Sequence, residues 1–419
     1  MAGEAWSDQS HLSPMRVTSL FLHPLHASLG STVRVRELAH SLSDLGVETE
    51  ILSPYEKDAA VRPGVRIRGV GGLSRSLGFA PLLYRLTRKA YYSRRLVRSF
   101  LVRETWRSLL AKQLATSALK VLKQHPTDIL QAEQDIAIGP CLELNKTLKL
   151  PLVASIHNLT SEELVASGVL SREDEEFRTM QAWMAEQLTA VDLTVVVSEE
   201  MQRYVITEYG VQKEKVVVVP PGGRPRVGPK RTVPPARNAV YAGLVSYREH
   251  VDLFVEAMPR ILRKAPDTRF HITEKGDDLE EIRRLARDLG VSPTFFWYEG
   301  EEDFYDFLAS CRVGVLPSTN DKARRMGTPV KMFDYLSVGL PIVANEIGGW
   351  TSMIRELGFG VLTSDSAAEF ADAVTLLLTD DQLRQTLAQK ALETVSLKHH
   401  WDNSAAILRE AYELLLKAS

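Results

Sequence analysis

Short apolar runs rich in β-branched residues alternate with amphipathic segments along most of the chain. The runs are typical of buried strands and lie at 15–25, 47–54, 65–72, 128–134, 150–158, 192–199 and 215–223, then at 238–244, 268–276, 294–300, 312–318, 342–345 and 358–363. Helical segments such as 33–46, which Gly46 terminates, separate these runs. The repeated order of strand, loop, helix and strand predicts parallel sheets covered by helices.

Two segments interrupt this alternation and organise the chain. A stretch rich in proline, glycine and arginine suits neither a helix nor a central strand, so we predict an interdomain linker at 224–236. A basic helical insertion spans about 81–125.

A chain of 419 residues is expected to form two hydrophobic cores. We predict an α/β fold of two doubly wound, Rossmann-like domains facing each other across a cleft, at 1–223 and 237–395. A closing helix at 396–419 is predicted to pack back on the first domain.

Composition narrows the class of protein. A formal net charge of −2 argues against a general nucleic-acid binder. Cys141 and Cys311 are far apart and are interpreted as reduced, buried thiols. The pair His399 and His400 is interpreted as surface residues rather than a metal site. The chain shows neither a secretory signal nor an apolar run of about 18 residues, so we expect a cytoplasmic protein.

The segment 327–344, GTPVKMFDYLSVGLPIVA, reads as a short helix followed by a buried strand. Thr328 is predicted to cap the helix, and Pro329 to occupy its first position. Gly339 is predicted to end the helix in a left-handed conformation. The free N–H groups and the dipole at such a helix start favour a bound anion.

Lys331 and Asp334 lie in the first turns of this helix. A cation in the first turn opposes the helix dipole, so a nearby phosphate would explain Lys331, and Arg324 and Arg325 add positive charge upstream. Asp334 could accept two hydrogen bonds from a diol. The alternative is a solvated pair of Lys331 with Asp334, which would stabilise the helix by only about 0.3 kcal/mol.

The segment 329–344, with Ile347, Gly348 and Gly349 after it, resembles the Pro-x-Lys-x-x-Glu-Tyr-x-x-x-Gly-x-Pro-Val signature of GT-B glycosyltransferases, closest to retaining family 4, the glycosyl transferases group 1. Further stretches resemble other segments of that family in the same order, at 30–54, 155–158, 194–223, 239–261 and 312–318. The resemblance implies transfer of a sugar from a nucleotide-diphosphate sugar to an acceptor hydroxyl, with retention and without a metal ion.

The resemblance also implies roles for individual residues. Asp334 takes the place of the motif glutamate that holds the ribose hydroxyls, and His157 matches a histidine near the transferred sugar, although a lone histidine after a strand is otherwise usually structural. The remaining implied donor contacts are the diphosphate cradle of Gly327, Thr328 and Pro329, the base site of Tyr298, Glu299 and Gly300, the first-domain loop of Gly30 and Ser31, and the later loop of Gly348 and Gly349.

The chain departs from the family pattern at the diphosphate clamp. Leu244 and Glu249 stand where the family has an arginine and a lysine. Arg248, Arg325 and Lys331 are our candidates for stabilising the leaving diphosphate, with Arg324 as a further replacement. Other departures are Met326 in place of the first motif glutamate, Ser352 in the glycine loop, and the sequence from Pro221 to Arg224 at the end of the first domain.

No Asp-x-Asp motif occurs in the chain, so no metal or other cofactor is expected. The run 84–107 is basic and interleaved with aromatic residues. It is either a helix packed on the first domain or a helix that lies on an anionic membrane. The second interpretation would make the protein peripheral on the inner face of the membrane, and an anionic or lipid-linked acceptor would suit it.

Two rival functions stay open at this point. A sugar-nucleotide epimerase of the same fold would need a carboxylate that abstracts a proton in the cleft. A degenerate, non-catalytic partner subunit would explain Leu244, Glu249 and Met326.

Overall fold

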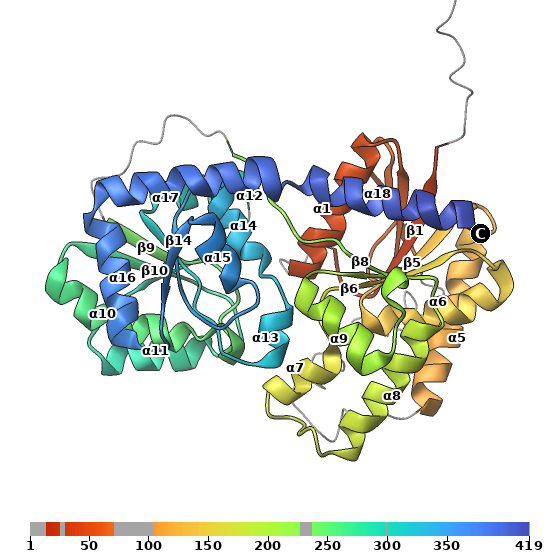
Figure 1. Ribbon diagram of the computed structural model, residues 1–419, viewed down its shortest axis with the longest axis horizontal. Helices are drawn as coiled ribbons and strands as arrows, with labels where there is room; N and C mark the ends of the chain where they lie inside the picture. Colours follow the sequence, from red (N-terminus) through yellow and green to blue (C-terminus); the bar gives the residue numbers. More distant parts are fainter. Residues whose placement is uncertain (1–13, 26–29, 71–103, 227–236, 299, 419) are drawn as a thin grey trace, which may run out of the picture.

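The computed structural model describes residues 14–25, 30–70, 104–226, 237–298 and 300–418. Within them the chain forms two mostly parallel sheets with helices on both faces (Figure 1), so the predicted doubly wound α/β architecture is confirmed. Glu299, the linker positions 227–236 and the basic run as far as 103 lie outside the described residues. Among the described helices, none is both long enough and apolar enough to cross a membrane.

The first sheet has the strand order β3-β4-β2-β1-β5-β6-β7-β8. Its strands are β1 Arg16–Phe21, β2 Glu48–Ser53, β3 Ala59–Arg62, β4 Val65–Gly69, β5 Ile129–Glu133, β6 Leu152–Ile156, β7 Leu193–Val196 and β8 Val216–Val218. The central strands are buried on both faces, which explains their near-continuous apolar runs.

Strand β3 was not predicted from the sequence. It pairs antiparallel with β4 across a turn at Pro63 and Gly64, whose φ of 76° favours glycine. Its four residues are mostly exposed, so they carry no apolar alternation that would reveal a strand.

Helices cover both faces of the first sheet. One apolar cluster joins a face of the sheet to α5, α6, α8 and α9, and another joins the opposite face to α1 and to α18 from the end of the chain. The helices of this part are α1 Gly30–Asp44, α5 Glu104–Leu122, α6 Asp135–Leu148, α7 Thr160–Ala166, α8 Glu175–Thr189 and α9 Glu199–Tyr209, with the short turn η2 Lys213–Lys215.

The second sheet has the strand order β11-β10-β9-β12-β13-β14. Its strands are β9 Arg237–Tyr241, β10 Thr268–Thr273, β11 Thr294–Phe296, β12 Val313–Val315, β13 Ile342–Asn345 and β14 Gly360–Thr363. From β9 the chain adds β10 and β11 on one side, and it then continues with β12, β13 and β14 on the other side of β9. Loops that leave the carboxyl ends of these two neighbouring strands diverge to opposite faces and open a crevice, where such sheets bind ligands.

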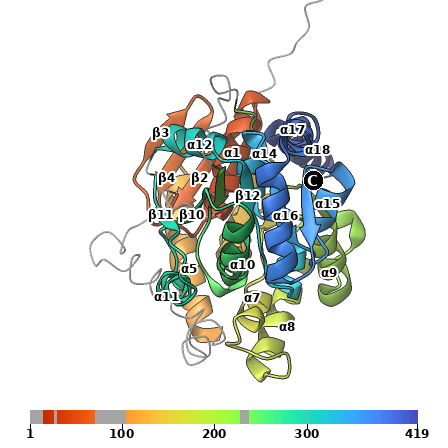
Figure 2. The same ribbon diagram turned by 90° about the vertical axis from the view of Figure 1, so that its left-hand side faces the viewer.

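The second sheet is likewise enclosed. One core cluster lies under α10, α11 and α16, and Figure 2 shows α10 beside α16. A second cluster lies under α12, α14 and α15 and contains the buried Cys311. The elements of this part are η3 Tyr247–Glu249, α10 Val251–Lys264, α11 Leu279–Asp288, α12 Glu301–Ser310, α13 Lys322–Met326, α14 Val330–Ser337, α15 Thr351–Leu357, α16 Ala367–Thr379, α17 Asp381–Glu393, η4 Thr394–Lys398 and α18 Trp401–Ala418.

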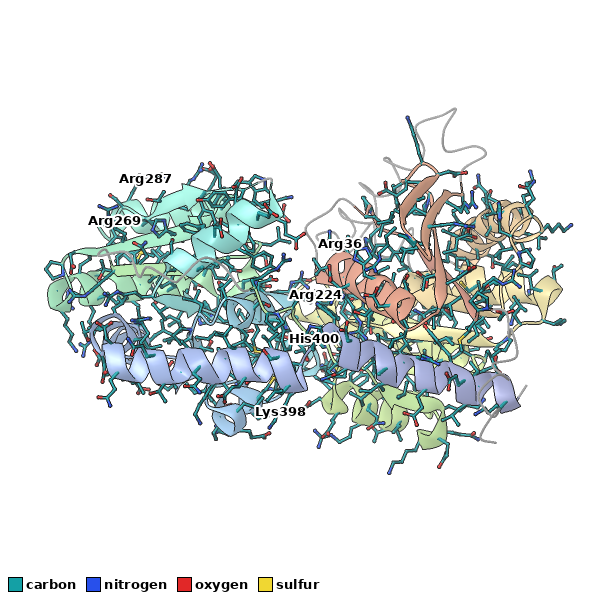
Figure 3. The ribbon with its side chains drawn as sticks, turned by 90° about the horizontal axis from the view of Figure 1, so that it is seen from above. Arg36, Arg224, Arg269, Arg287, Lys398 and His400 are labelled. Carbon is teal, nitrogen blue, oxygen red and sulfur yellow. The ribbon has the colours of Figure 1, made fainter. Side chains whose placement is uncertain are left out.

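The chain returns from the second sheet to the first through η4, and α18 then packs along α1 (Figure 1). Each sheet with its helices forms one lobe. The segment that returns to the first lobe contacts residues 222–224, through which the chain leaves that lobe, and Figure 3 shows Arg224 beside His400 at this junction. The Gly223 N–H donates to the His399 carbonyl oxygen at 2.8 Å. A Cβ on Gly222 would lie only 2.6 Å from that oxygen, so the two crossings fit together because this glycine lacks a side chain.

We expect Gly223→Ala to lower the free energy of unfolding by roughly 1–3 kcal/mol, because the added methyl group overpacks the junction. Its Cβ would lie 2.5 Å from Val395 Cγ2 and 2.6 Å from Ser337 Oγ. Gly139→Ala within α6 is the matched control: its Cβ meets nothing closer than 3.6 Å, so it should leave stability unchanged or raise it. Urea unfolding of both variants measures the difference, and equal midpoints would contradict close packing at the junction.

Candidate functional site

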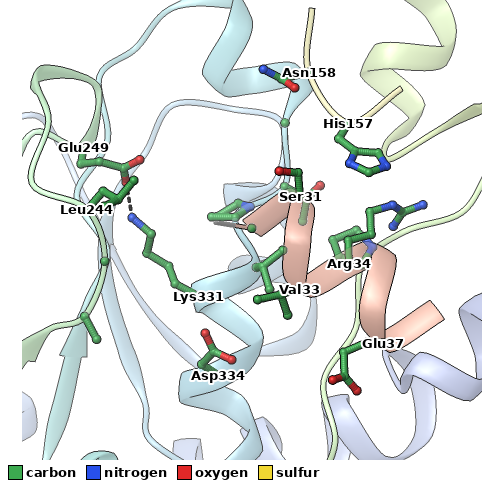
Figure 4. A pocket seen from close by; sticks show the side chains of 18 of the residues that line it. Ser31, Val33, Arg34, Glu37, His157, Asn158, Leu244, Glu249, Lys331 and Asp334 are labelled. Atoms are coloured by element: carbon green, nitrogen blue, oxygen red, sulfur yellow. Dashed lines mark hydrogen bonds and ion pairs between the residues drawn. The ribbon is translucent and has the colours of Figure 1, made fainter. Parts of the chain in front are cut away.

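A cavity of about 940 Å³ lies between the carboxyl ends of the two sheets. Most of the site residues expected from the sequence line it: Gly30, Ser31, His157, Arg248, Tyr298, Gly300, Gly327, Thr328, Pro329, Lys331 and Asp334. Figure 4 shows Lys331 and Asp334 on one wall, with His157 and the start of α1 on the other. Arg325, Gly348 and Gly349 are not among the lining residues; Arg325 Nη1 donates to Asn320 Oδ1 at 2.7 Å, and Gly349 packs against the Arg325 backbone.

Helix α14 enters the cavity with its first turn. It starts at Val330, one residue later than predicted: Pro329 has an extended ψ of 120°, so it precedes the helix, and Thr328 is not the cap. Tyr335 anchors the helix beneath the sheet, because its hydroxyl accepts from the Ala242 N–H at 2.7 Å. Gly339, with φ of 63°, ends the helix as predicted. The anchored Tyr335 leaves the preceding Asp334 facing the cavity.

An ion cluster built around the buried Glu249 lies at the start of α14, and the side chains of its cations, Lys331 and Arg324, are 16% and 17% exposed. Lys331 Nζ pairs with the Glu249 carboxylate and lies 3.0 Å from the Tyr241 hydroxyl, and Arg324 Nη2 lies 3.2 Å from Glu249 Oε1. The alternative of a solvated pair between Lys331 and Asp334 is therefore wrong. Lys331 instead reaches across to the loop after β9, as the dashed line in Figure 4 shows.

Burial and charge act in opposite directions on this cluster. Burial alone would raise the pKa of Glu249, which is 8% exposed, but Arg324 and Lys331 more than offset it and lower that pKa to about 2. Burial also lowers the pKa of Lys331, which Glu249 partly restores. Glu249 therefore stays ionised and holds two largely desolvated cations in place before any ligand arrives.

Arg248 connects the two walls of the cavity. It lies in η3 of the second sheet and forms an ion pair with Glu163 of α7 in the first part of the chain. Ser198 Oγ also donates across the junction to the Met326 carbonyl oxygen at 2.6 Å. On the wall that belongs to the second sheet, here the second wall, Arg248, Arg324 and Lys331 thus already have carboxylate partners.

Asp334 has one direct partner within the described structure: its Oδ1 accepts from the Tyr305 hydroxyl at 2.8 Å. Burial, with smaller contributions from the Glu301 and Glu37 charges, raises the pKa of Asp334 to about 6 against the opposing effects of Tyr305 and Arg226. The carboxyl group is thus ionised at neutral pH and has acceptor capacity left toward the cavity.

The opposite wall carries a second buried charge network. His157 Nε2 lies 2.9 Å from Glu133 Oε2 at the ends of β6 and β5. Arg34, only 2% exposed, donates to the Val219 carbonyl oxygen at 2.7 Å and lies close enough to favour the ionised form of Glu133. Burial lowers the pKa of His157, opposed by Glu133, so the imidazole is neutral beside an ionised carboxylate.

Gln134 has a strained backbone next to this network. Its φ of 75° and ψ of 160° belong to a region that is essentially restricted to glycine. The side chain lines the cavity, and its buried Oε1 has no hydrogen-bond partner in the described structure. Strain of this kind persists at sites where a side chain must point in one direction for function.

An aromatic ledge borders the cavity at the end of β11. Trp297 and Tyr298 are 41% and 36% exposed, and Lys275 Nζ lies 4.3 Å from the centroid of the Trp297 ring. Exposed rings beside a cavity can stack on a planar group.

Sequence reasoning missed Glu133, Gln134, Arg34 and Trp297. Polar residues at the end of the run 128–134 were a usable signal, because the carboxyl ends of neighbouring parallel strands meet at one edge. Arg34 was hidden within a helix that reads as ordinarily amphipathic. Neither Glu133 nor Arg34 could be paired from the sequence, because their positions are 99 residues apart.

The remaining chemical candidates lie apart from this cavity. Cys141 and Cys311 are buried free thiols. His400 Nδ1 contacts Asp402 at 3.2 Å at the junction. In the portion of the chain that is described, no three His, Cys, Asp or Glu side chains are grouped as metal ligands.

Two family models together cover most of the chain. The description "Glycosyltransferase Family 4" matches residues 29–223, and "Glycosyl transferases group 1" matches 236–380. The chain is a GT-B glycosyltransferase related to family 4. A D-inositol 3-phosphate glycosyltransferase from Kribbella flavida is 24% identical, over 91% of this chain and 90% of that protein.

Solved structures show the same fold. Sucrose-phosphate synthase from Thermosynechococcus elongatus superposes with a TM-score of 0.73 at 16% identity, covering 97% of this glycosyltransferase and all of that chain. Anabaena Alr3699/HepE, in a complex with UDP and glucose, superposes with a TM-score of 0.66 at 15% identity, covering 95% and 99% of the two chains.

Gln134→Gly tests whether the strained backbone serves function. We expect the substitution to raise the free energy of unfolding by about 1 kcal/mol, because glycine adopts this conformation without strain, while glycosyl transfer falls through loss of the amide. Lys149→Gly is the control: this exposed residue has φ of 57° outside the cavity, so it should gain stability and keep full activity. A Gln134→Gly variant with unchanged activity would show that the strain has no functional role.

Proposed function

We propose that this glycosyltransferase moves a sugar from a nucleoside-diphosphate sugar to an acceptor hydroxyl, without a resident metal ion and with retention of the anomeric configuration. The observation that carries the proposal is the buried cluster of Lys331, Arg324 and Glu249 at the start of α14, which faces His157 across one cavity. Positive charge beside free helix N–H groups suits a diphosphate.

The donor is assigned to the second wall. Asp334, which lines the cavity and has acceptor capacity left, would accept hydrogen bonds from the ribose diol, and the exposed Trp297 ring would stack on the base. Lys331 and Arg324 would lie at the diphosphate between them. The UDP and glucose in the Anabaena structure support a nucleoside-diphosphate sugar as the donor class.

The charge on the diphosphate grows during the reaction. The acceptor oxygen forms a bond to the anomeric carbon as the bond from that carbon to the phosphate oxygen breaks. The bonding electrons stay on the phosphate, and the acceptor proton passes to the departing diphosphate on the same face. Lys331 and Arg324 stabilise this developing charge because they are held in place before the reaction.

Metal independence is part of the proposal. Arg248, Arg324 and Lys331 carry three positive charges against the two carboxylates of Glu163 and Glu249, which leaves a net positive charge for a diphosphate. The chain has no Asp-x-Asp motif for a bound Mg²⁺.

The acceptor is assigned to the first wall, beside His157, Gln134 and Asn158. The relative from Kribbella flavida is a D-inositol 3-phosphate glycosyltransferase, so a phosphorylated polyol is the first acceptor to test. A lipid-linked acceptor and a membrane contact through 84–107 stay predictions.

A transfer assay tests the proposal. The full chain is incubated with UDP-glucose and other sugar nucleotides, with and without inositol phosphate, and released nucleoside diphosphate and product are measured. We expect a product of retained configuration and an unchanged rate in excess chelator. Isomerised donor without transfer would favour the epimerase, and an absence of nucleotide binding would reject the proposal.

Lys331→Met in the same assay should lower kcat/KM by about a hundredfold, because one fixed charge at the leaving group is lost. Lys322→Met on the neighbouring α13 is the control, since Lys322 contacts Glu208 and Tyr204 and does not line the cavity. Similar rates in the two variants would remove Lys331 from the mechanism.

Donor affinity should depend on the ionisation of Asp334. Its pKa of about 6 makes the ionised fraction roughly tenfold lower at pH 5 than at pH 7. A protonated carboxyl group accepts fewer hydrogen bonds, so calorimetry should show weaker UDP binding as the pH falls through 6. Asp334→Asn should bind UDP weakly and without this dependence. An equally steep pH dependence in Asp334→Asn would assign the effect to another group.

A further inference from the structure

A chain of polar contacts runs from the last helix to the back of the cavity. Tyr412 of α18 is completely buried, and its hydroxyl oxygen lies 2.5 Å from Gln131 Oε1. The Gln131 amide nitrogen in turn donates to Glu133 Oε1, and Glu133 Oε2 contacts His157 Nε2 at 2.9 Å. Of these four residues only His157 lines the cavity.

The direction of each bond follows from its chemistry. Burial opposes ionisation of Glu133, but contacts with His157, Gln131 and Arg34 lower its pKa, so it is a carboxylate that can only accept. Gln131 must therefore turn its N–H groups toward Glu133 and its carbonyl oxygen toward Tyr412. Tyr412 satisfies that oxygen by donating its O–H. The opposite amide orientation would place two acceptors face to face.

The same logic extends to the imidazole. His157 Nε2 lies 2.9 Å from Glu133 Oε2 and 3.1 Å from Ser155 Oγ. Because the carboxylate can only accept and the hydroxyl can also accept, Nε2 carries the proton and Nδ1 has the lone pair. In the described structure His157 Nδ1 has no hydrogen-bond partner and is buried beside the cavity. It is left as an acceptor for a donor group on a bound ligand.

We propose that Tyr412 is a positioning residue for glycosyl transfer: through Gln131 it fixes the Glu133 carboxylate, which sets the tautomer and orientation of His157. The inference rests on the proposed function, since it assigns a task to the wall where the acceptor and the transferred sugar are expected. Helix α18 follows the second sheet in the chain but packs on the first sheet and on α1. Through Tyr412 it would also act on the cavity, in addition to covering α1.

Tyr412→Phe tests the hydroxyl while keeping the ring. Two readouts are combined: kcat and donor KM across the pH range, and the tautomer of His157 from long-range ¹⁵N–¹H spectra, with its signal assigned by a His157→Gln variant. We expect kcat to fall by roughly three- to tenfold, as for the loss of one buried hydrogen bond, with donor KM unchanged. The spectra should change from the Nε2–H form to a mixture.

Tyr204→Phe is the matched control. Its hydroxyl also makes a buried 2.5 Å hydrogen bond, to Glu162 Oε1, but Tyr204 does not line the cavity or contact the His157 network. It should lose similar thermal stability while kcat, its pH profile and the His157 tautomer stay as in the wild type. Gln131→Met should reproduce the Tyr412→Phe effect, and the double variant should lose no more than Gln131→Met alone.

The outcomes separate this inference from the proposed function. An unchanged His157 tautomer in Tyr412→Phe, or equal losses of kcat in Tyr412→Phe and Tyr204→Phe, would overturn the positioning role. A wild-type chain that transfers no sugar from any donor would overturn the proposed function instead, and the spectra would still decide whether Tyr412 sets the state of His157.

Discussion

Ion pairing with the buried carboxylate of Glu249 is the interaction on which the second wall of the cavity depends. Two largely desolvated cations close together repel each other and lose hydration, so neither Lys331 nor Arg324 would stay there without a counter-charge. Glu249 supplies that charge from the loop after β9, in reach of the first turn of α14. The positive groups of this wall thus come from α13 and α14, and the loop after β9 contributes the anion that holds them.

On the wall formed by the first sheet, the first wall, the buried group that needs a counter-charge is an anion. Glu133 is the buried charge there, and Arg34, Gln131 and His157 stabilise its ionised form. Both walls therefore have their charged groups oriented before a ligand binds, which reduces the reorganisation needed when charge develops during a reaction. Ion pairing of Arg248 with Glu163 joins the walls, so movement of one lobe relative to the other must break or rearrange that pair.

Unusual backbone conformation and burial of charged side chains occur together at the site. Gln134 has a glycine-like backbone at the carboxyl edge of the first sheet, and charged side chains are buried at Arg34 and Glu249. Outside the site the departures are milder: Lys149 has a left-handed backbone at the end of α6, whereas Gly339 ends α14 and glycines allow close approach at the junction between the two sheets. This contrast is expected of a functional site, where geometry is kept at some cost in stability.

The sequence by itself determined the two parallel sheets, the order of their strands along the chain and the helix that carries Lys331 and Asp334, because periodicity and capping are local properties. It did not reveal β3, whose exposed residues have no apolar pattern, or the first helical residue of α14, since Pro329 is compatible with both conformations. Only the tertiary structure decided which charges meet. Lys331 lies 82 positions from Glu249, and Tyr412 lies 281 positions from Gln131. Pairing across such distances depends on how the loops at the strand ends and the returning α18 come together, and no local pattern encodes that packing.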